Sequence, residues 1–164
     1  MTKPNCWLFD GRPFDVSDID KYEGFVYLIV NTITGQKYIG RKYFFEIKKI
    51  RKKRKRQRTP SNWADYFGSS KQLLADIDKY GIVNFERHIL SLHKTRGDCN
   101  YQETKLQFAL DVLERPLFYN ENINGKWHRK PGHIIEGRCM STKLKDLLCE
   151  SISDLSTKKA STIL

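Results

Sequence analysis

The hydrophobic pattern of the chain centres on two apolar runs separated by a short polar segment. Residues 24–30 and 37–43 are the apolar runs, and residues 31–36 contain the Asn, Thr and Gly typical of a turn between antiparallel strands. Successive strand side chains point to opposite faces. One face carries Phe25, Tyr27 and Ile29, and the other carries Val26, Leu28 and Val30. The pattern predicts a β-hairpin whose first strand lies inside a sheet.

The second predicted strand brings another aromatic residue, Tyr38, into the hairpin, and we expect this strand to continue as far as Phe45. If the register sets Tyr27 opposite Tyr38, both phenols project from one face, close enough to share a substrate or a water molecule. Ordinary core packing of two aromatic residues is the alternative interpretation.

A helix and a third strand follow. Residues 71–80 are amphipathic, with Ser69 or Ser70 as the N-cap and Gly81 as the C-terminal stop. The apolar stripe of this helix consists of Leu73, Leu74 and Ile77. Residues 85–93 alternate as a strand does, which places His88 and His93 on opposite faces and argues against a shared metal site.

A second helix is predicted over residues 101–114, capped by Asp98 or Asn100 and ending before Pro116. The side chains expected to face the sheet are Leu106, Ala109, Leu110 and Leu113. The order strand, strand, helix, strand, helix predicts an α+β fold: a small three-stranded antiparallel sheet flanked by helices.

The 164 residues fit one domain with two appendages. We predict an irregular lead-in over residues 1–23, a domain over residues 24–123 and a weakly structured tail over residues 124–164. The four cysteines have no metal-ligand spacing, and neither a membrane span nor a signal peptide is visible. We therefore expect a cytoplasmic protein that is neither secreted nor membrane-bound.

Charge indicates the partner. The net charge is +11, and nine of the eleven residues at 48–58 are Lys or Arg, which favours a polyanion such as nucleic acid over a membrane surface. We predict a mobile loop that contacts the DNA backbone, while a solvated loop and a nuclear localisation signal are the alternatives. The predicted DNA-binding residues are Lys48, Lys49, Arg51, Lys52, Lys53, Arg54, Lys55, Arg56 and Arg58, with Ser69, Ser70 and Lys71 holding phosphate at a helix N-terminus.

Two tripeptides carry a family resemblance. Tyr38-Ile39-Gly40 is an intact YIG motif, and Phe25-Val26-Tyr27 stands upstream where Gly-Ile-Tyr is usual. Over residues 24–123 the chain resembles the GIY-YIG nuclease superfamily, and within it the small stand-alone bacteriophage endonucleases of the homing type. Phe25 departs from the usual glycine, but the tyrosine carries the chemistry.

This resemblance implies a metal-dependent endonuclease that hydrolyses double-stranded DNA with one Mg²⁺ or Mn²⁺ ion held by Glu103. By the same likeness Tyr27 takes part in deprotonating the attacking water, and Tyr38 orients water or phosphate. A phenol needs nearby cations to ionise, and Arg41 and Lys42 are the candidates. The alternatives are a first-turn helix acid for Glu103 and ordinary strand-edge cations for Arg41 and Lys42.

Other parts of the family pattern match less closely. The catalytic arginine that normally follows the YIG motif on a helix is not found, and Lys48, Arg51 and Arg58 are substitutes by position. Tyr66 stands for the aromatic residue one turn later, or it packs with its aromatic neighbours. Asn120 resembles the asparagine that hydrogen-bonds near the active-site backbone, or it is a turn residue.

Two functions remain in competition. The first is a phage-encoded DNA endonuclease, for homing or for degrading or excluding DNA, acting in the host cytoplasm as a monomer or as a dimer on DNA. The second is a nucleic-acid-binding protein of the same fold with weak catalysis, which the missing arginine favours.

Overall fold

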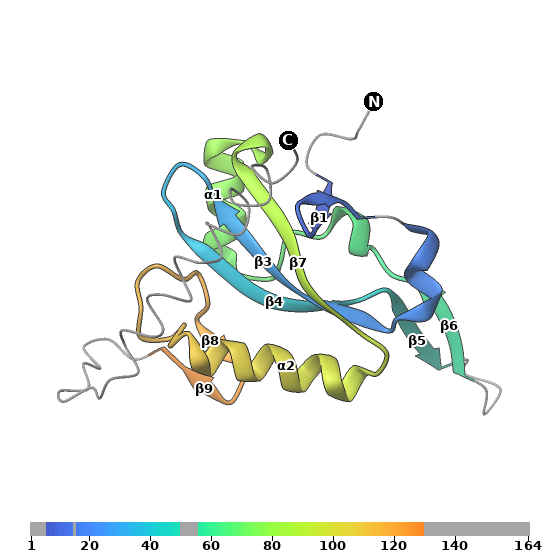
Figure 1. The fold of residues 1–164 in the computed structure, drawn as a ribbon. Coiled ribbons are helices and arrows are strands. Elements are labelled where there is room, and N and C mark those ends of the chain that lie inside the picture. The colour runs from blue at the N-terminus through green and yellow to red at the C-terminus, as the bar shows by residue number, and fades with distance from the viewer. Residues whose placement is uncertain (1–5, 15, 50–55, 130–164) are drawn as a thin grey trace, which may run out of the picture.

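A mixed sheet forms the centre of the protein, seen in a computed structural model that describes residues 6–14, 16–49 and 56–129. The described part of the chain builds a five-stranded sheet in the order β2-β1-β7-β3-β4 (Figure 1). Its strands are β1 Trp7–Phe9, β2 Arg12–Pro13, β3 Gly24–Asn31, β4 Lys37–Tyr43 and β7 Phe85–His93. The antiparallel core β4-β3-β7 is the predicted three-stranded sheet, and the lead-in extends it because β1 pairs in parallel with β7.

Two α-helices cover the two faces of this sheet, α1 Lys71–Tyr80 and α2 Arg96–Ala109. Phe25, Tyr27 and Ile29 pack in one cluster with Leu73 of α1. The other cluster consists of Val26, Leu28 and Ile39 with Cys99 of α2 and Leu110 beyond it. The prediction that β3 is apolar on both faces is confirmed. Short 3-10 helices lie at Val16–Lys21, Trp63–Asp65 and Ile82–Asn84.

Helix α1 has the predicted bounds. The Ser70 hydroxyl oxygen accepts a hydrogen bond from the amide of Leu73 at 3.4 Å, and Gly81 ends the helix with φ of 85°, a conformation that favours glycine. Leu73 is buried, but Leu74 is 42% exposed, so its place on the apolar stripe was predicted wrongly. Leu74 lies about 100° further around the helix, away from the sheet.

Helix α2 begins and ends earlier than predicted. Thr95 is the N-cap, and its hydroxyl accepts from the amide of Asp98 at 3.1 Å, whereas the prediction made Asp98 or Asn100 the cap. The helix ends at Ala109 because Asp111 adopts a left-handed conformation, with φ of 50°. Ala109 is exposed, contrary to prediction, while Leu110 and Leu113 reach the core from the turn that follows.

The β3–β4 hairpin has a different register from the one considered. Tyr27 lies opposite Gly40, and Tyr38 lies opposite Ile29. Residues directly opposite and two apart share a face, so both phenols still project from the same side. Their ring centroids are 6.1 Å apart. The offset follows from pairing Val30 with Lys37 at the turn.

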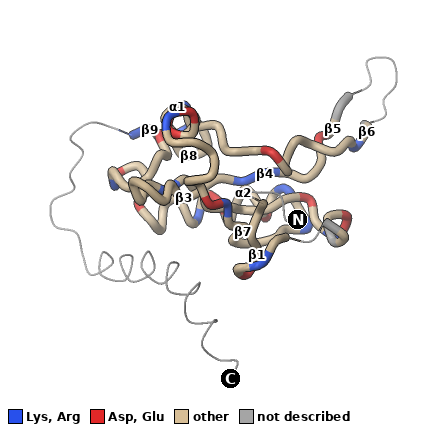
Figure 2. Tube along the Cα trace, turned by 90° about the horizontal axis from the view of Figure 1, so that it is seen from above, with Lys and Arg blue, Asp and Glu red and all other residues tan. Residues whose placement is uncertain are grey.

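The basic block forms a second, separate sheet. Instead of continuing to Phe45, the chain leaves β4 at the buried Phe44, and β5 Phe45–Lys49 pairs with β6 Arg56–Pro60. This β5–β6 ribbon extends away from the rest of the described chain (Figures 1 and 2). The prediction of a loop is therefore wrong for both arms, while residues 50–55, the centre of the predicted DNA-binding block, lie outside the described residues.

The described chain extends beyond residue 123, the predicted end of the domain, as far as residue 129. Strands β8 Asn122–Ile123 and β9 Trp127–His128 form a small hairpin. Arg129 then places its Nη2 atom 2.8–3.2 Å from four carbonyl oxygens, those of Val112, Arg115, Phe118 and Asn120. The rest of the predicted tail, residues 130–164, lies outside the described residues.

A β-bulge corrects the prediction for the two histidines. The pairing of β3 with β7 shifts between Val26 and Tyr27, so both His88 and His93 lie on the α2 side of the sheet. His93 bonds Asp98 at 2.6 Å and His88 bonds Glu86 at 3.0 Å. Each histidine therefore has its own acid. None of the helices in the described part of the chain has the length and apolar character needed to span a bilayer.

Candidate active site

One cleft gathers all the predicted catalytic residues except Asn120. It has a volume of about 590 Å³ and lies at the centre of the β4 strand, with walls from β3, α2, the base of β5 and the segment before α1. The predicted residues that line it are Tyr27, Tyr38, Arg41, Lys42, Tyr66, Ser69 and Glu103. A second hollow of about 460 Å³ adjoins it and shares Tyr38, Arg41, Ser69 and Glu103. We refer to the two adjoining hollows together as the groove.

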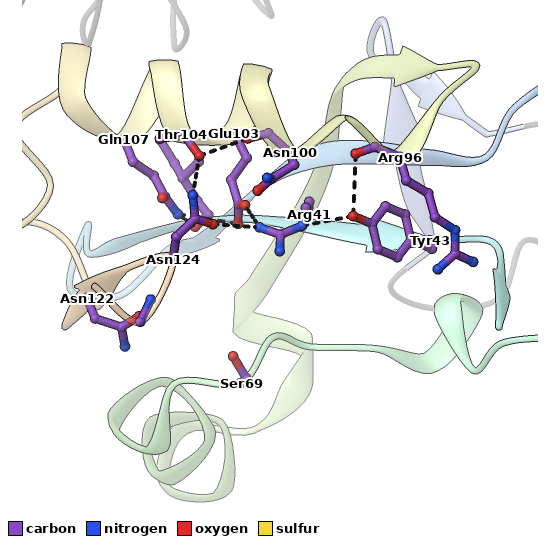
Figure 3. Close-up of polar contacts among 12 residues, drawn as sticks. Arg41, Tyr43, Ser69, Arg96, Asn100, Glu103, Thr104, Gln107, Asn122 and Asn124 are labelled. Atoms are coloured by element: carbon purple, nitrogen blue, oxygen red, sulfur yellow. Dashed lines mark hydrogen bonds and ion pairs between the residues drawn. The ribbon is translucent and has the colours of Figure 1, made fainter. Parts of the chain in front are cut away.

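Glu103 points from α2 toward β4 (Figure 3). It is only 7% exposed, and its Oε2 atom forms an ion pair with Nη1 of Arg41. Its other oxygen lies 3.4 Å from the side-chain amide nitrogen of Gln107. Burial raises the pKa of the Glu103 carboxyl, and the Arg41 charge opposes that rise. This acid lies in the middle of its helix because α2 begins at Arg96, so the first-turn alternative is wrong.

Arg41 has acceptors on three sides. Besides Glu103, its Nη1 donates to Oδ1 of Asn124 at 3.1 Å, and its Nε donates to the Tyr43 hydroxyl at 3.2 Å (Figure 3). Burial lowers the pKa of the guanidinium, but the Glu103 charge and these hydrogen bonds outweigh it, and the net direction is upward. The interpretation of Arg41 as an ordinary strand-edge cation does not describe this geometry.

Three phenols lie along the floor of the cleft. The ring centroids of Tyr38 and Tyr66 lie 6.1 Å and 6.2 Å from that of the buried Tyr27. The glycine of the YIG motif follows from this cluster, because a Cβ added at Gly40 would lie 2.5 Å from the Tyr27 hydroxyl. Position 40 therefore needs glycine to leave room for the phenol.

The cations do not favour a Tyr27 phenolate. Burial raises the Tyr27 pKa well above its usual value, and the neighbouring Tyr38, Tyr66 and Glu103 raise it further. Arg41 is paired with Glu103, and the Lys42 ammonium lies 4.0 Å from the Tyr66 ring centroid and donates to Asn62 at 2.6 Å. The expectation that Arg41 and Lys42 lower the Tyr27 pKa is wrong for this structure. Burial likewise raises the pKa of Tyr38, while its hydrogen bond with Ser69 acts in the opposite direction.

Asn120 makes the hydrogen bonds predicted for it. Its Oδ1 accepts from the Ile39 amide at 3.0 Å, and its Nδ2 donates to the Ile39 carbonyl at 2.8 Å. Gln107 Nε2 donates to the same carbonyl at 3.0 Å. Two side chains thus fix the peptide between Tyr38 and Gly40.

The N-terminus of α1 faces the second hollow. The Ser69 hydroxyl lies 3.2 Å from the Tyr38 hydroxyl, whereas the Ser70 hydroxyl is used as the helix cap and donates to the Tyr119 carbonyl at 3.2 Å. Lys71 is exposed at the hollow's edge. Ser69 and Lys71 therefore remain accessible from the groove, and Ser70 is a structural cap.

The substitutes for the missing arginine are not brought into the cleft where they are described. Arg58 lies over the Phe45 ring at 3.5 Å and pairs with Glu23 at 3.0 Å. Arg51 lies outside the described residues, and for Lys48 only the backbone is described. Among described residues, Arg41 and Arg96 are the arginines that line the cleft.

Sequence reasoning missed several of the supporting residues. Arg96, the first residue of α2, was hidden because the helix start was placed too late. Arg87 of β7 is buried between Trp7 and Phe67 and donates to the carbonyls of Ala64 and Tyr66, so it fixes the segment that carries Tyr66. One signal for Arg87 was available in the sequence. It is a charged residue at an inward-facing position of the alternating pattern of β7, which indicates a buried charge with a structural role.

The site fits a single magnesium ion. Mg²⁺ is usually held by one or two carboxylates with water and substrate phosphate in the remaining positions. Glu103 is the buried carboxylate of the groove, whereas Glu46 and Glu121, which also line it, are exposed. Over residues 6–14, 16–49 and 56–129, no three His, Cys, Asp or Glu side chains come together as a metal-binding group. Glu103 is thus the side chain that would hold the ion.

Comparison with known proteins agrees with the class of fold. Residues 7–123 match the family described as "Putative endonuclease segE, GIY-YIG domain". This match covers more than half of the chain, which therefore belongs to the GIY-YIG superfamily, a family of nucleases that implies a nucleic-acid substrate. The match begins at Trp7, so it includes β1 of the lead-in. Neither the curated proteins nor the solved structures that were searched contained a match.

Proposed function

We propose that the protein is a metal-dependent endonuclease that hydrolyses phosphodiester bonds of double-stranded DNA. The observation that carries this proposal is the convergence of Glu103, Arg41 and three phenols in one groove. Phosphodiester hydrolysis needs an oriented water, neutralised phosphate charge and a proton donor for the leaving oxygen. Side chains of the groove meet the first two requirements, and water in the open cleft supplies the proton for the leaving oxygen.

The roles follow from the contacts. Glu103 holds a Mg²⁺ or Mn²⁺ ion, which when bound polarises the phosphate and acidifies a water. Tyr27, kept neutral by its raised pKa, orients the attacking water through its hydroxyl, and water in the cleft takes the proton that the attacking water loses and gives one to the leaving oxygen. Tyr38, with Ser69 at 3.2 Å, holds a phosphate oxygen or a water. Lys42 and Arg41 supply positive charge beside the phosphate.

The ribbon supports a double-stranded substrate. Phe45, Glu46 and Ile47 at the base of β5 line the cleft, so the ribbon leads directly away from the reaction centre. A two-stranded ribbon fits the major groove of a duplex, and the lysines and arginines of residues 48–58 suit its phosphates. A phage-encoded role in homing or DNA degradation, in the host cytoplasm, remains part of this proposal.

Nicking of supercoiled plasmid with added Mg²⁺ tests the proposal. We expect Glu103→Gln to lower the cleavage rate on the order of 10³-fold while gel-shift affinity for DNA stays within a few-fold of wild type. Glu86→Gln is the matched control, because Glu86 is exposed and pairs with His88, outside the groove. Equal cleavage by wild type and Glu103→Gln would reject the site.

A second candidate is a DNA-binding protein with weak catalysis. The ion pair between Arg41 and Glu103 favours it, since the metal-holding acid is already occupied by a protein cation. The same assay decides between the two: duplex binding without nicking in either Mg²⁺ or Mn²⁺ would support the second candidate.

A further inference from the structure

The Glu103 carboxylate faces two competing cations. Arg41 pairs with its Oε2 atom, and the divalent ion of the proposed function needs the same side chain. A guanidinium and a divalent ion on one buried carboxylate repel each other, and one negative charge cannot neutralise three positive charges. Arg41 must therefore move off Glu103 when the ion binds.

Arg41 has a second anchorage that does not depend on Glu103. Asn124 Oδ1 accepts from Nη1 at 3.1 Å, and the Tyr43 hydroxyl accepts from Nε at 3.2 Å. These two acceptors lie on opposite sides of the guanidinium and come from the β8–β9 turn and the end of β4 (Figure 3). Loss of Glu103 would leave both bonds in place.

Both acceptors are themselves fixed to α2. Asn124 Nδ2 donates to the Thr104 hydroxyl at 2.6 Å, and that hydroxyl donates to the Asn100 carbonyl at 2.8 Å. The Tyr43 hydroxyl lies 3.5 Å from the Arg96 carbonyl, and the Arg96 guanidinium lies 4.4 Å from the Tyr43 ring centroid. Both acceptors of Arg41 are thus tied to the helix that carries Glu103.

We propose that Asn124 and Tyr43 are positioning residues that keep Arg41 in the groove and direct its guanidinium from Glu103 to the phosphate of the DNA. This inference rests on the proposed function, in which Glu103 holds the ion. Arg41 blocks the acid in the free protein and becomes a phosphate ligand in the complex. Binding of the ion and binding of DNA then strengthen each other, because each requires Arg41 to be off Glu103.

Direct Mn²⁺ binding tests the competition between Arg41 and the ion for Glu103 without any cleavage. Binding is measured as the loss of the electron paramagnetic resonance signal of free Mn²⁺. We expect Arg41→Gln to bind Mn²⁺ more tightly than wild type by on the order of tenfold, within the usual range of coupling between ligands. Lys42→Gln is the matched control: it removes an equal charge from the same cleft but not from Glu103, and should change the affinity by less than about threefold.

Glu103→Gln distinguishes the claim that Glu103 holds the ion from the claim that Arg41 competes with the ion. If Glu103→Gln leaves Mn²⁺ affinity unchanged, the metal assignment of the proposed function fails. If Glu103→Gln abolishes binding but Arg41→Gln binds no more tightly than wild type, the metal assignment stands and the competition is rejected.

The positioning role is tested by duplex binding in EDTA and in Ca²⁺, measured by gel shift. We expect Ca²⁺ to raise wild-type affinity, Arg41→Gln to lose this rise, and Asn124→Gly to lose most of it. Glycine suits position 124, where φ is 51°, so the variant removes the amide without straining the turn. Thr104→Val, which releases Asn124 without touching Arg41, should act in the same direction more weakly.

A rise with Ca²⁺ that is equal in wild type and Asn124→Gly would overturn the role of Asn124. Thermal melting provides the check on folding: a loss of the Ca²⁺ effect supports the proposal where the variant melts as wild type does. Should Asn124→Gly melt early, the Thr104→Val result decides, because that variant leaves Asn124 and its turn in place and removes the hydroxyl that Asn124 donates to.

Discussion

The groove and the base of the β5–β6 ribbon each contain an ion pair between an arginine and a glutamate, but the two pairs differ in burial. In the groove, Arg41 meets a carboxylate that is 7% exposed, and the pKa of each partner is displaced. At the base of the ribbon, Arg58 meets Glu23 and the Phe45 ring, but its side chain is 42% exposed. Solvent screens the second pair and hardly screens the first. Burial decides which charges can do chemistry and which only set an orientation.

The two regions also differ in how they are attached. The groove is built on β3, β4 and α2, whose side chains fill both core clusters. The ribbon is a sheet of its own and joins the core through Phe44 and Phe45 and through Glu23, which pairs with Arg58 and with Arg96. The ribbon can therefore be altered without unfolding the domain, and the core cannot.

Removal of the ribbon should give the largest effect on DNA binding. Replacing residues 46–59 by a short Gly-Ser turn should lower duplex affinity by on the order of 10²-fold at low salt. The log–log salt slope should flatten by about 0.9 for each phosphate that the shortened protein no longer neutralises. A full-length ribbon with Ser in place of its lysines and arginines is the control for length. A salt slope equal to that of wild type would mean that the ribbon does not touch phosphate.

A pair of Tyr→Phe variants compares chemistry with packing inside the core. Tyr27→Phe should lower the nicking rate by about 10²-fold with unchanged DNA affinity, because it removes the hydroxyl that faces the reacting water. The Tyr119 hydroxyl instead accepts from Asn31 at 2.9 Å and donates to Asp76 at 2.8 Å. Tyr119→Phe should cost about 1–3 kcal/mol in the free energy of unfolding and leave the nicking rate unchanged. Thermal melting and plasmid nicking measure the two quantities, and equal nicking by the two variants would refute the distinction.

The smallest change in stability and DNA affinity is expected at Glu23, where the β5–β6 ribbon meets the rest of the domain. Glu23→Gln should loosen the ribbon, because one carboxylate holds both Arg58 and Arg96. We expect a stability change within about 1 kcal/mol, typical of exposed pairs, and a few-fold loss of duplex affinity. Amide hydrogen exchange should rise in β5 and β6 and stay constant in β3. Faster exchange throughout the protein would show instead that Glu23 supports the whole fold.

What the sequence could predict depended on local periodicity. Helix α1 and strand β7 have helical or alternating patterns of apolar residues, and their bounds were predicted correctly; the β3–β4 hairpin was predicted too, but β4 ends at Tyr43 and not at Phe45. Tyr27, Tyr38 and Glu103 were placed in one site because strand parity and a family likeness both pointed there. Contacts between distant residues had no such signal: nothing in the order of residues pairs Arg41 with Asn124, which lie 83 positions apart.

The errors have a common physical source. In the ribbon, the apolar residues of β5 are limited to Phe45 and Ile47, and β6 consists of charged, polar and proline residues, so no sustained apolar alternation marks the two segments as strands. In α2, the cap Thr95 precedes three weak helix formers, Gly97, Asp98 and Asn100, and the helix start was therefore sought too late. In β7, a bulge shifted the faces, which no residue type announces.

Arg129 bears on where this chain can be shortened. Its guanidinium donates hydrogen bonds to carbonyl oxygens of the loop between α2 and β8, and its backbone amide donates to the Glu121 carbonyl at 2.8 Å. That loop presents Asn120 to the YIG peptide and leads into the turn that holds Asn124 against Arg41. A shortened chain that keeps the groove intact should therefore end after residue 129. Ending it at Ile123, the limit of the family match, would remove Arg129 and its hydrogen bonds to the loop that carries Asn120.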